Sequence, residues 1–266
     1  MLIESSQNQT FKNLLKFQDK KFRNQNNIFL VEGKKQVAEI PKDWTIKQII
    51  ISKKYKKFKN FRDDIILSER LFAKLSSTKS PQGIIAVVEK KYYKIEEIIK
   101  QQTGFFIVLE NIQDPGNLGT IIRSADAFGA KAIFVSLRSV DIYSDKTIRS
   151  TMGSLFHLPV VDNVNIEELL YLMKKERITV FAGSLKGKKS MSNLKIPNRS
   201  TFIIGNEANG IKQETEKLAN VLFKIPIPGK AESLNAAVAA SIIMYELSKN
   251  NKEKDSRRKL NFPLLS

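Results

Sequence analysis

Short apolar runs alternate regularly with amphipathic or alanine-rich stretches from residue 97 onward. Such runs are typical of strands buried on both faces, and the stretches between them have helical spacing. Strands separated by helices in this way predict a mainly parallel α/β sheet with both faces covered. The expected strands are residues 105–110, 131–136, 158–161, 178–184, 201–205 and 221–227, and the expected helices are residues 117–129, 145–156, 166–176, 213–220 and 233–249.

A smaller alternation of the same kind precedes this one, and the polar segment 92–103 is expected to connect the two. Its expected strands are residues 27–33, 44–52, 64–68 and 83–90, and its expected helices are residues 4–20, 34–40 and 69–77. The chain is long enough for two ordinary domains. The sequence therefore predicts a small α/β domain over residues 1–96, a larger one over residues 97–249 and a basic C-terminal tail over residues 250–266.

Three turns rich in Gly, Asn and Pro carry an unusual number of polar side chains. They lie within residues 110–130, 202–211 and 225–240, each after an expected strand, and the first and third lead into alanine-rich helices. Open α/β sheets bind their ligands at the carboxyl ends of the strands. We therefore expect the three turns to build one site together.

None of these turns matches a nucleotide-binding loop. The segment PGNLG has the wrong glycine spacing for GxGxxG, and the chain contains no GxxxxGK[ST] sequence. The segment GSLKGKK (residues 183–189) resembles a phosphate loop only superficially, because no Ser or Thr follows its lysine. It is interpreted as a solvated basic loop or as a contact to phosphate.

Each polar residue of the three turns also has a purely structural interpretation. Asn117 is expected to cap the helix that follows it. Arg123 on that helix, considered by itself, could be an ordinary surface residue. Glu207 after an apolar strand favours a charged partner such as Arg123, but it could be a helix cap. Ser233 and Asn235 precede the last helix, where serine is a common N-cap. The set is therefore more informative than any one member.

The charge of the chain changes the picture further. It has 45 Lys and Arg against 27 Asp and Glu, a net charge of +18. The first 100 residues hold 22 basic and 11 acidic side chains. A field of this sign attracts polyanions, and nucleic acid is the usual one. A lysine-rich genome-wide bias is the alternative explanation.

Missing residue types exclude several kinds of chemistry. The chain has no cysteine and one histidine, His157, within an apolar stretch. Disulfides, thiolate zinc sites, histidine metal cages and a Ser–His–Asp triad are therefore not expected, and His157 is interpreted as a packing or hydrogen-bonding residue. No run of 18 apolar residues indicates a membrane span. We expect a cytoplasmic protein that needs no metal and no membrane.

The three turns together resemble the motifs of the SpoU/TrmH family of RNA ribose 2′-O-methyltransferases, part of the SPOUT superfamily. The family pattern reads N-x-x-D-P-x-N-x-G-x-x-x-R-x-A, then G-x-E-x-x-G-I, then I-P-x-x-G-x-x-x-S-L-N. This chain matches every fixed position, in that order. Residues 1–95, with FLVEG and LSSTKSPQGIIAVV, are similar to the N-terminal substrate-binding domain of the family.

The resemblance implies a trefoil-knotted, parallel-sheet SPOUT methyltransferase domain of α/β class, preceded by a small α/β RNA-binding domain that resembles ribosomal proteins. It implies S-adenosylmethionine as the methyl donor and a homodimer with active sites at the subunit interface. The cofactor-binding residues implied by the family motifs are Gly205, Asn206, Ile225, Ile227, Gly229, Ser233 and Leu234. The catalytic residues implied are Arg123, Asn117, Glu207, Ser233 and Asn235.

Methyl transfer to a ribose hydroxyl is an in-line displacement, so both reactants must be held in line. The family residue that matches Arg123 is proposed to help deprotonate the hydroxyl. A guanidinium has a pKa above about 12 and is a poor base. We prefer Arg123 as a cation that stabilises the developing alkoxide, while the proton leaves through phosphate or water. Glu207 would orient Arg123, and the neutral side chains would position the reactants.

The first domain contains a basic segment with two aromatic residues, KKYKKFK (residues 53–59), which indicates a role in RNA binding. Lysines can bind phosphates and an aromatic ring can stack on an unpaired base, although a solvated loop with core aromatics would have the same sequence. The expected RNA-binding residues are Lys53, Lys54, Tyr55, Lys56, Lys57, Lys59, Lys146 and Arg149.

The function that this reading favours is S-adenosylmethionine-dependent ribose methylation of RNA, with large-subunit ribosomal RNA preferred over transfer RNA. A non-catalytic RNA-binding factor in ribosome assembly is the first alternative, and loss of Arg123 or Asn235 would favour it. Both residues are present. A small-molecule methyltransferase is disfavoured by the charge and by the additional basic domain.

Overall fold

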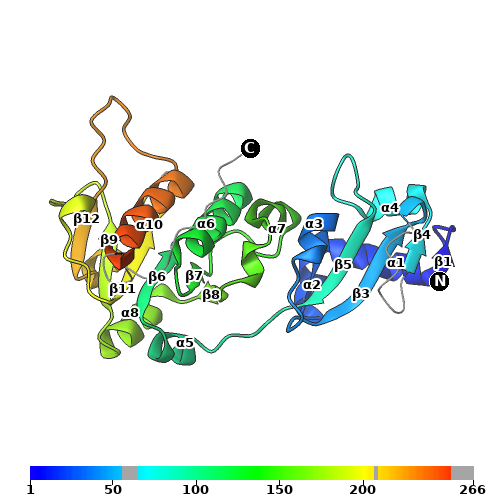
Figure 1. The fold of residues 1–266 in the computed structure, drawn as a ribbon, viewed down its shortest axis with the longest axis horizontal. Coiled ribbons are helices and arrows are strands. Elements are labelled where there is room, and N and C mark those ends of the chain that lie inside the picture. Colours follow the sequence, from blue (N-terminus) through cyan, green and yellow to red (C-terminus); the bar gives the residue numbers. More distant parts are fainter. Residues whose placement is uncertain (56–64, 207–208, 253–266) are drawn as a thin grey trace.

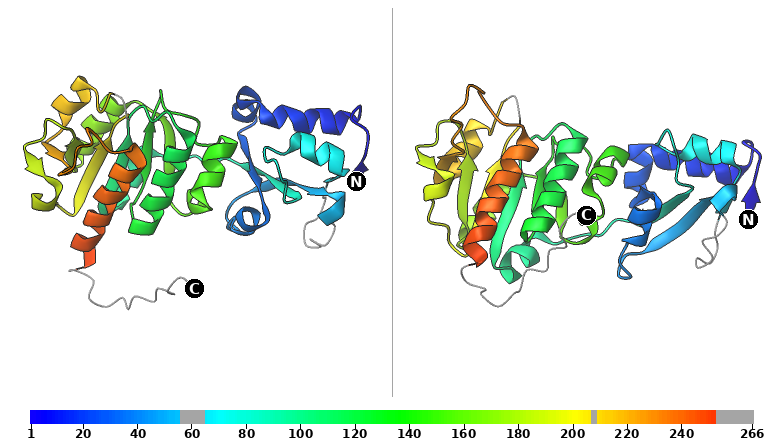
Figure 2. Two further views of the ribbon diagram at one scale, coloured as in Figure 1. Left: turned by 90° about the horizontal axis from the view of Figure 1, so that it is seen from above. Right: turned by 45° about the horizontal axis from the view of Figure 1, so that its top comes forward.

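The computed structural model describes residues 1–55, 65–206 and 209–252. They fold into two α/β lobes, one from each predicted half of the chain, which lie next to each other along the long axis (Figures 1 and 2). Each lobe is built around its own sheet. The predicted α/β class is confirmed. No helix within the described ranges is long and apolar enough to cross a membrane.

The N-terminal lobe has a five-stranded mixed sheet of order β1-β4-β3-β5-β2. Strand β5 runs antiparallel to both of its neighbours, whereas β1, β4 and β3 are parallel. Successive side chains of β3 enter different clusters, with Ile49 and Ile51 on one face and Ile50 on the other. The elements are β1 (Leu2–Ile3), α1 (Gln9–Leu15), α2 (Lys20–Gln25), β2 (Ile28–Glu32), α3 (Lys34–Ala38), β3 (Ile46–Ser52), β4 (Ile65–Leu67), α4 (Glu69–Leu75) and β5 (Ile84–Glu89).

The C-terminal lobe has a seven-stranded, all-parallel sheet of order β10-β12-β9-β11-β6-β7-β8. Its strands are β6 (Gly104–Leu109), β7 (Ile133–Ser136), β8 (Val160–Val164), β9 (Thr179–Gly183), β10 (Lys189–Ser190), β11 (Arg199–Ile204) and β12 (Val221–Lys224). Its helices are α5 (Ile95–Gln101), α6 (Pro115–Phe128), α7 (Asp145–Thr151), α8 (Ile166–Lys175), α9 (Gln213–Leu218) and α10 (Ala236–Lys252).

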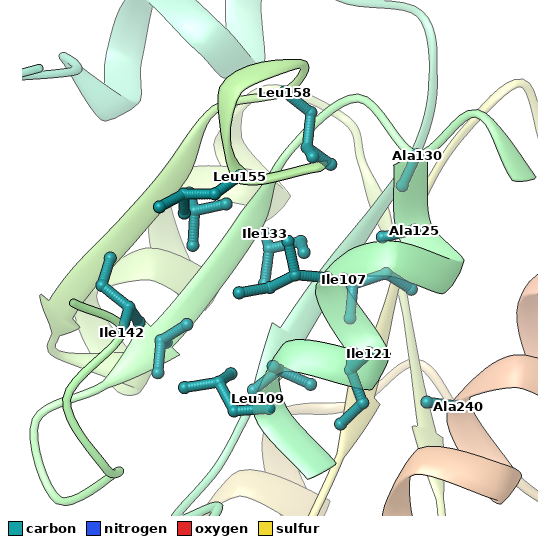
Figure 3. Close-up of a cluster of buried hydrophobic side chains, with 14 of the residues drawn as sticks. Ile107, Leu109, Ile121, Ala125, Ala130, Ile133, Ile142, Leu155, Leu158 and Ala240 are labelled. Carbon is teal, nitrogen blue, oxygen red and sulfur yellow. The ribbon is translucent and has the colours of Figure 1, made fainter. Parts of the chain in front are cut away.

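Helices cover both faces of this sheet. Ile121 of α6 and Ala240 of α10 belong to the cluster on one face, which Figure 3 shows with Ile107 and Ile133 of the sheet. Helices α5 and α8 pack on the other face. Helices α6 and α10 lie side by side (Figure 2). The first and third polar turns therefore lie at the beginnings of two neighbouring helices.

Several helices differ from the predicted ones: residues 4–20 contain α1 and only the first residue of α2, and the helix predicted at 145–156 ends at Thr151. The segment 92–103 contains α5, because Ile98 and Ile99 lie on one helical face and pack against the sheet. Helix α6 begins at Pro115 and is capped by Asp114, so Asn117 is not its N-cap. The last helix begins at Ala236, after Asn235, and not at residue 233. The side chains of Asp114 and Asn235 accept from the first backbone N–H groups of α6 and α10 and so take the capping positions.

Side chains from both lobes meet at a buried seam. The ring of Phe29 lies 4.8 Å from that of Tyr143, and Trp44 contacts Phe156 edge to face at 5.0 Å. Arg23 of α2 and Asp141 form an ion pair of 3.0 Å. Their side chains are only 8% and 10% exposed. The orientation of the two lobes is therefore fixed by packing as well as by charge.

Candidate active site

The loops after β9, β11 and β12 enclose a pocket of about 430 Å³ against the start of α10. All three strands end at the carboxyl edge of the parallel sheet, where ligands are expected. The predicted cofactor residues that line it are Gly205, Asn206, Ile225, Ile227, Ser233 and Leu234. Gly229 is the predicted cofactor residue that does not line it. Two of the three polar turns thus converge on one cavity.

The turn after β11 is folded back tightly on itself. Asn206 and Gly210 exchange backbone hydrogen bonds of 3.1 and 2.8 Å. A Cβ at Gly205 would lie 2.2 Å from the carbonyl carbon of Gly210, so the returning chain leaves no room for a side chain. Gly205 is required by this close approach. The turn that forms one wall of the pocket therefore has a fixed shape.

Two buried contacts fasten this turn to the end of β6. Asn206 donates from Nδ2 to the carbonyl oxygen of Asn111 at 3.0 Å. Glu110, only 2% exposed, accepts from the Lys212 backbone N–H at 3.0 Å and from Thr215 Oγ1 at 2.9 Å. No local pattern indicates this role for Glu110, because its partners lie about 100 residues away. The first and second polar turns are thus parts of one framework.

The first and third turns meet through Asn117 and Asn235. Asn235 donates from Nδ2 to Asn117 Oδ1 at 3.1 Å. Its own Oδ1 accepts from the backbone N–H groups of Ala237 and Val238 and so caps α10. The amide of Asn235 is therefore oriented by the helix that it caps.

Asp114 holds the beginning of α6 in place. Its Oδ1 accepts from the Asn117 N–H at 2.8 Å and its Oδ2 pairs with Lys146 of α7 at 2.9 Å. The pKa of Asp114 is lowered below its usual 3.8, mainly by the hydrogen bond from Lys146 and next by that from the Asn117 N–H. Asp114 therefore stays ionised and joins α7 to the helix that carries Arg123.

Arg123 lies on the exposed side of α6 and does not line the pocket. Six residues of helix separate it from Asn117, about 9 Å along the axis. Its guanidinium makes no hydrogen bond or ion pair with any residue in the described part of the chain. Glu207, the predicted partner, lies outside the described residues. Arg123 is therefore presented outward.

A carboxylate that the sequence did not single out lines the pocket. Glu216 of α9 accepts from Ser184 Oγ at 2.6 Å and from Lys186 Nζ at 3.1 Å. Both bonds lower the pKa of Glu216, and the bond from Ser184 has the larger effect. An ionised carboxylate among apolar walls can accept hydrogen bonds from hydroxyl or ammonium groups of a ligand.

Four of the predicted RNA-binding residues that the structure describes, Lys53, Tyr55, Lys146 and Arg149, have side-chain partners within the protein. Lys53 pairs with Glu4 at 2.9 Å. The ring of Tyr55 packs on Gly83 and lies 4.5 Å below Lys34 Nζ, as expected of a core aromatic. Lys54 is exposed and donates its backbone N–H to Glu69, and Arg149 donates to Ser77 Oγ across the seam. Lys56, Lys57 and Lys59 lie outside the described residues.

His157 is half exposed, and its Nδ1 lies 2.7 Å from Asp126 Oδ2. The pair joins the end of α6 to the segment before β8, away from the pocket. This contact agrees with the expected hydrogen-bonding role of the single histidine.

Family models match both parts of the chain. Residues 104–245 match the SpoU rRNA Methylase family, and residues 8–86 match the MRM3-like substrate binding domain. The 23S rRNA (guanosine(2553)-2′-O)-methyltransferase RlmP of Bacillus subtilis is 34% identical over 249 residues, which cover 92% of this chain and 98% of that protein.

Solved structures agree with the sequence comparison. An AdoMet-bound rRNA methyltransferase from Sinorhizobium meliloti has a TM-score of 0.85 at 28% identity and covers 94% of this chain and 98% of its own. The SpoU methyltransferase AviRb from Streptomyces viridochromogenes, in complex with AdoMet, has a TM-score of 0.84 at 27% identity, with coverage of 92% and 98%. Both of these relatives extend over the two lobes.

Proposed function

This chain belongs to the SpoU rRNA methylase family, and from that premise we propose that it methylates a ribose 2′-hydroxyl of 23S rRNA with S-adenosylmethionine as the donor. The observation that carries this function is the convergence of the family's turns on one pocket and one asparagine pair. RlmP, which aligns over 98% of its length, modifies a guanosine, so we propose a guanosine ribose as the acceptor. An enzyme of ribosomal RNA would work in the cytoplasm.

The pocket fits the donor in size and in chemistry. Its volume of about 430 Å³ lies in the range of small-molecule sites. Ile225, Ile227 and Leu234 would contact the adenine, and backbone groups near Gly205 and Asn206 would bind its polar edge. Glu216 offers an ionised acceptor for ribose hydroxyls or the ammonium group. When bound, S-adenosylmethionine supplies an electrophilic methyl group on a sulfonium.

The residues of the polar turns would divide the remaining work. The pair of Asn117 and Asn235 would hold the acceptor ribose with neutral amide groups, whose orientation α10 fixes. Ser233 lines the pocket and would hydrogen-bond to either reactant. Arg123 would place its positive charge beside the developing alkoxide, with Glu207 as its orienting partner.

We propose a homodimer that completes this site. Val238 and Tyr245 are 48% and 50% exposed and lie seven positions apart, on the same side of α10. Arg123 is exposed on the neighbouring helix α6. Packing this face against a second copy would bury the apolar side chains and would cover Arg123. The arginine would then act in a site from which water is excluded.

The N-terminal part of the chain, residues 1–96, would bind RNA and deliver it to the catalytic part, residues 97–249. Lys146 and Arg149 on α7 lie between the two lobes and would continue a basic path from the KKYKKFK segment to the pocket. Lys53, Lys54 and the lysines at 56, 57 and 59 would bind phosphates. The trefoil knot stays a prediction.

Transfer of labelled methyl from S-adenosylmethionine to 23S rRNA tests this function. We expect the purified protein to label 23S rRNA from a strain that lacks the gene, at a single ribose 2′-oxygen. Nucleotide mapping of the product identifies the position. Transfer to a base, or to transfer RNA alone, would contradict the proposed function.

A further inference from the structure

A second hollow lies beside the cofactor pocket, at the carboxyl ends of β6 and β11. It measures about 410 Å³ and shares Asn206, Asn209 and Gly210 with that pocket. A ligand in it would therefore lie next to the methyl donor, with one turn of chain between them. Asn111 is a fixed position of the first family motif, whereas Gln113, Arg138, Lys212 and Gln213 occupy no fixed position of any of the motifs.

Charge distinguishes this hollow. Arg138 and Lys212 line it, and both side chains are exposed. Neither cationic group makes a hydrogen bond or ion pair with another residue of the described ranges. Among the described residues, the carboxylates nearby line an adjoining hollow of about 180 Å³, which Arg138 and Lys212 also line; there Glu110 accepts two hydrogen bonds and Glu167 is exposed. Two cations thus lie over a wall of amides (Asn111, Gln113, Asn206, Asn209 and Gln213), to which Gly210 and Ile211 also contribute.

The wall of amides is rigid. Gln113 donates from Nε2 to the carbonyl oxygens of Asn111, at 3.1 Å, and of Arg138, at 2.7 Å. The Asn111 N–H donates to Ser136 Oγ at 2.9 Å. These bonds fix the backbone beside Arg138 to the turn after β6. The hollow is therefore preorganised without any contribution from a ligand.

We propose that this hollow binds a nucleotide of the RNA next to the one that is methylated. Cations bind phosphate, and amides recognise the edges of unpaired bases. Arg138 and Lys212 would hold the phosphate, and the exposed Leu137 in the adjoining hollow would contact the base. Gln113 acts as a positioning residue through the backbone of Arg138. This assignment rests on the proposed function, because the bound nucleotide is part of its substrate.

The double variant Arg138→Gln with Lys212→Gln tests the proposal in the full-length protein. We expect KM for a 23S rRNA fragment to rise at least 10-fold, while the Kd for S-adenosylmethionine stays unchanged. Loss of the one phosphate contact should make the slope of log Kd for RNA against log salt shallower by about 0.7. The matched control is Lys100→Gln with Lys175→Gln, which removes the same charge from exposed positions on α5 and α8.

The variant Gln113→Ala tests the proposal independently, through the positioning of the Arg138 backbone. It leaves both cations in place and should raise KM for RNA severalfold without changing the salt slope. A double variant that retained the KM and salt slope of the wild type would overturn the proposal, as would a matching loss in the control. A weaker Kd for S-adenosylmethionine would also overturn it, since the hollow would then belong to the cofactor. If the wild-type protein transferred no methyl group, the proposed function would fail, but RNA affinity and its salt slope would still decide the role of the hollow.

Discussion

At the scale of single residues, the site depends on side chains that are oriented before any ligand binds. Asn235 shows this best, because its Oδ1 caps α10 and its Nδ2 is thereby directed to Asn117. Replacement by Asp would keep the acceptor but remove the donor. The acceptor oxygen of Asn117 would then face a carboxylate.

We expect Asn235→Asp to retain the fold and to lower kcat at least 100-fold, because a negative charge would lie where an alkoxide forms. Thermal unfolding and single-turnover transfer measure the two properties separately. Asn235→Ala is the matched variant: it should lower kcat and also destabilise the protein by about 0.5–2 kcal/mol through loss of the cap. Full transfer activity in the Asp variant would contradict the proposal that the asparagine pair holds the acceptor ribose.

Asp114 has a pH-dependent effect on stability. Its pKa is lower in the folded protein than the usual 3.8, so the ionised form stabilises the folded state above that pH. This contribution is lost as the pH falls through the lower folded-state pKa. Asp114→Asn should therefore be less stable than the wild type at pH 6, and the difference should shrink as the pH falls below 3.8. A difference in unfolding temperature that did not change with pH would contradict the assigned pairing with Lys146.

At the scale of elements, two close approaches of backbone decide how the site is held together. Gly119 of α6 lies against α7, where a Cβ would be 2.4 Å from Ser150 Cβ and 2.7 Å from the carbonyl oxygen of Thr147. Through this contact and through Lys146, α7 lies directly on the helix that carries Arg123. A side chain at position 119 would push the two helices apart.

Gly119→Ala should destabilise the protein by about 1–3 kcal/mol, as overpacking of a tight contact does. Urea unfolding measures the loss, and Thr120→Ala, exposed on the same helix, is the control. An Ala variant as stable as the wild type would mean that α7 moves freely on α6.

The sequence predicted these elements unevenly. The strands of the parallel sheet and the polar turns at their ends were predictable, because apolar runs and Gly/Asn/Pro turns are local signals. Helix α5 was missed because its short apolar stripe is bounded by charged residues. The roles of Glu110 and Glu216 depend on partners from distant segments, and no local pattern indicates them.

At the scale of the whole molecule, the seam between the lobes fixes where RNA would lie relative to the pocket. Arg23 donates to Asp141 and also to the carbonyl oxygens of Phe17 and Gln18. Removing the carboxylate would leave a buried guanidinium with one partner fewer. Breaking a buried pair in this way typically costs about 3–5 kcal/mol.

We therefore expect Asp141→Ala to loosen the lobes and to lower kcat/KM for RNA at least 10-fold, with unchanged affinity for S-adenosylmethionine. Small-angle scattering should show a broader range of lobe separations. The matched surface pair is that of Lys47 and Glu89, whose side chains are 50% and 36% exposed. Lys47→Gln should change neither quantity measurably. Equal effects of the two substitutions would show that the seam does not set the lobe orientation.

The most direct test of the central claim is single-turnover methyl transfer to 23S rRNA by the wild type and by Arg123→Ala, with S-adenosylmethionine binding measured in parallel. The side chain of Arg123 is exposed and makes no hydrogen bond or ion pair within the described part of the chain, so the variant should fold and bind the cofactor normally. We predict that transfer falls at least 1,000-fold, about 4 kcal/mol of transition-state stabilisation. Transfer at the rate of the wild type would contradict the claim that this guanidinium acts at the ribose hydroxyl.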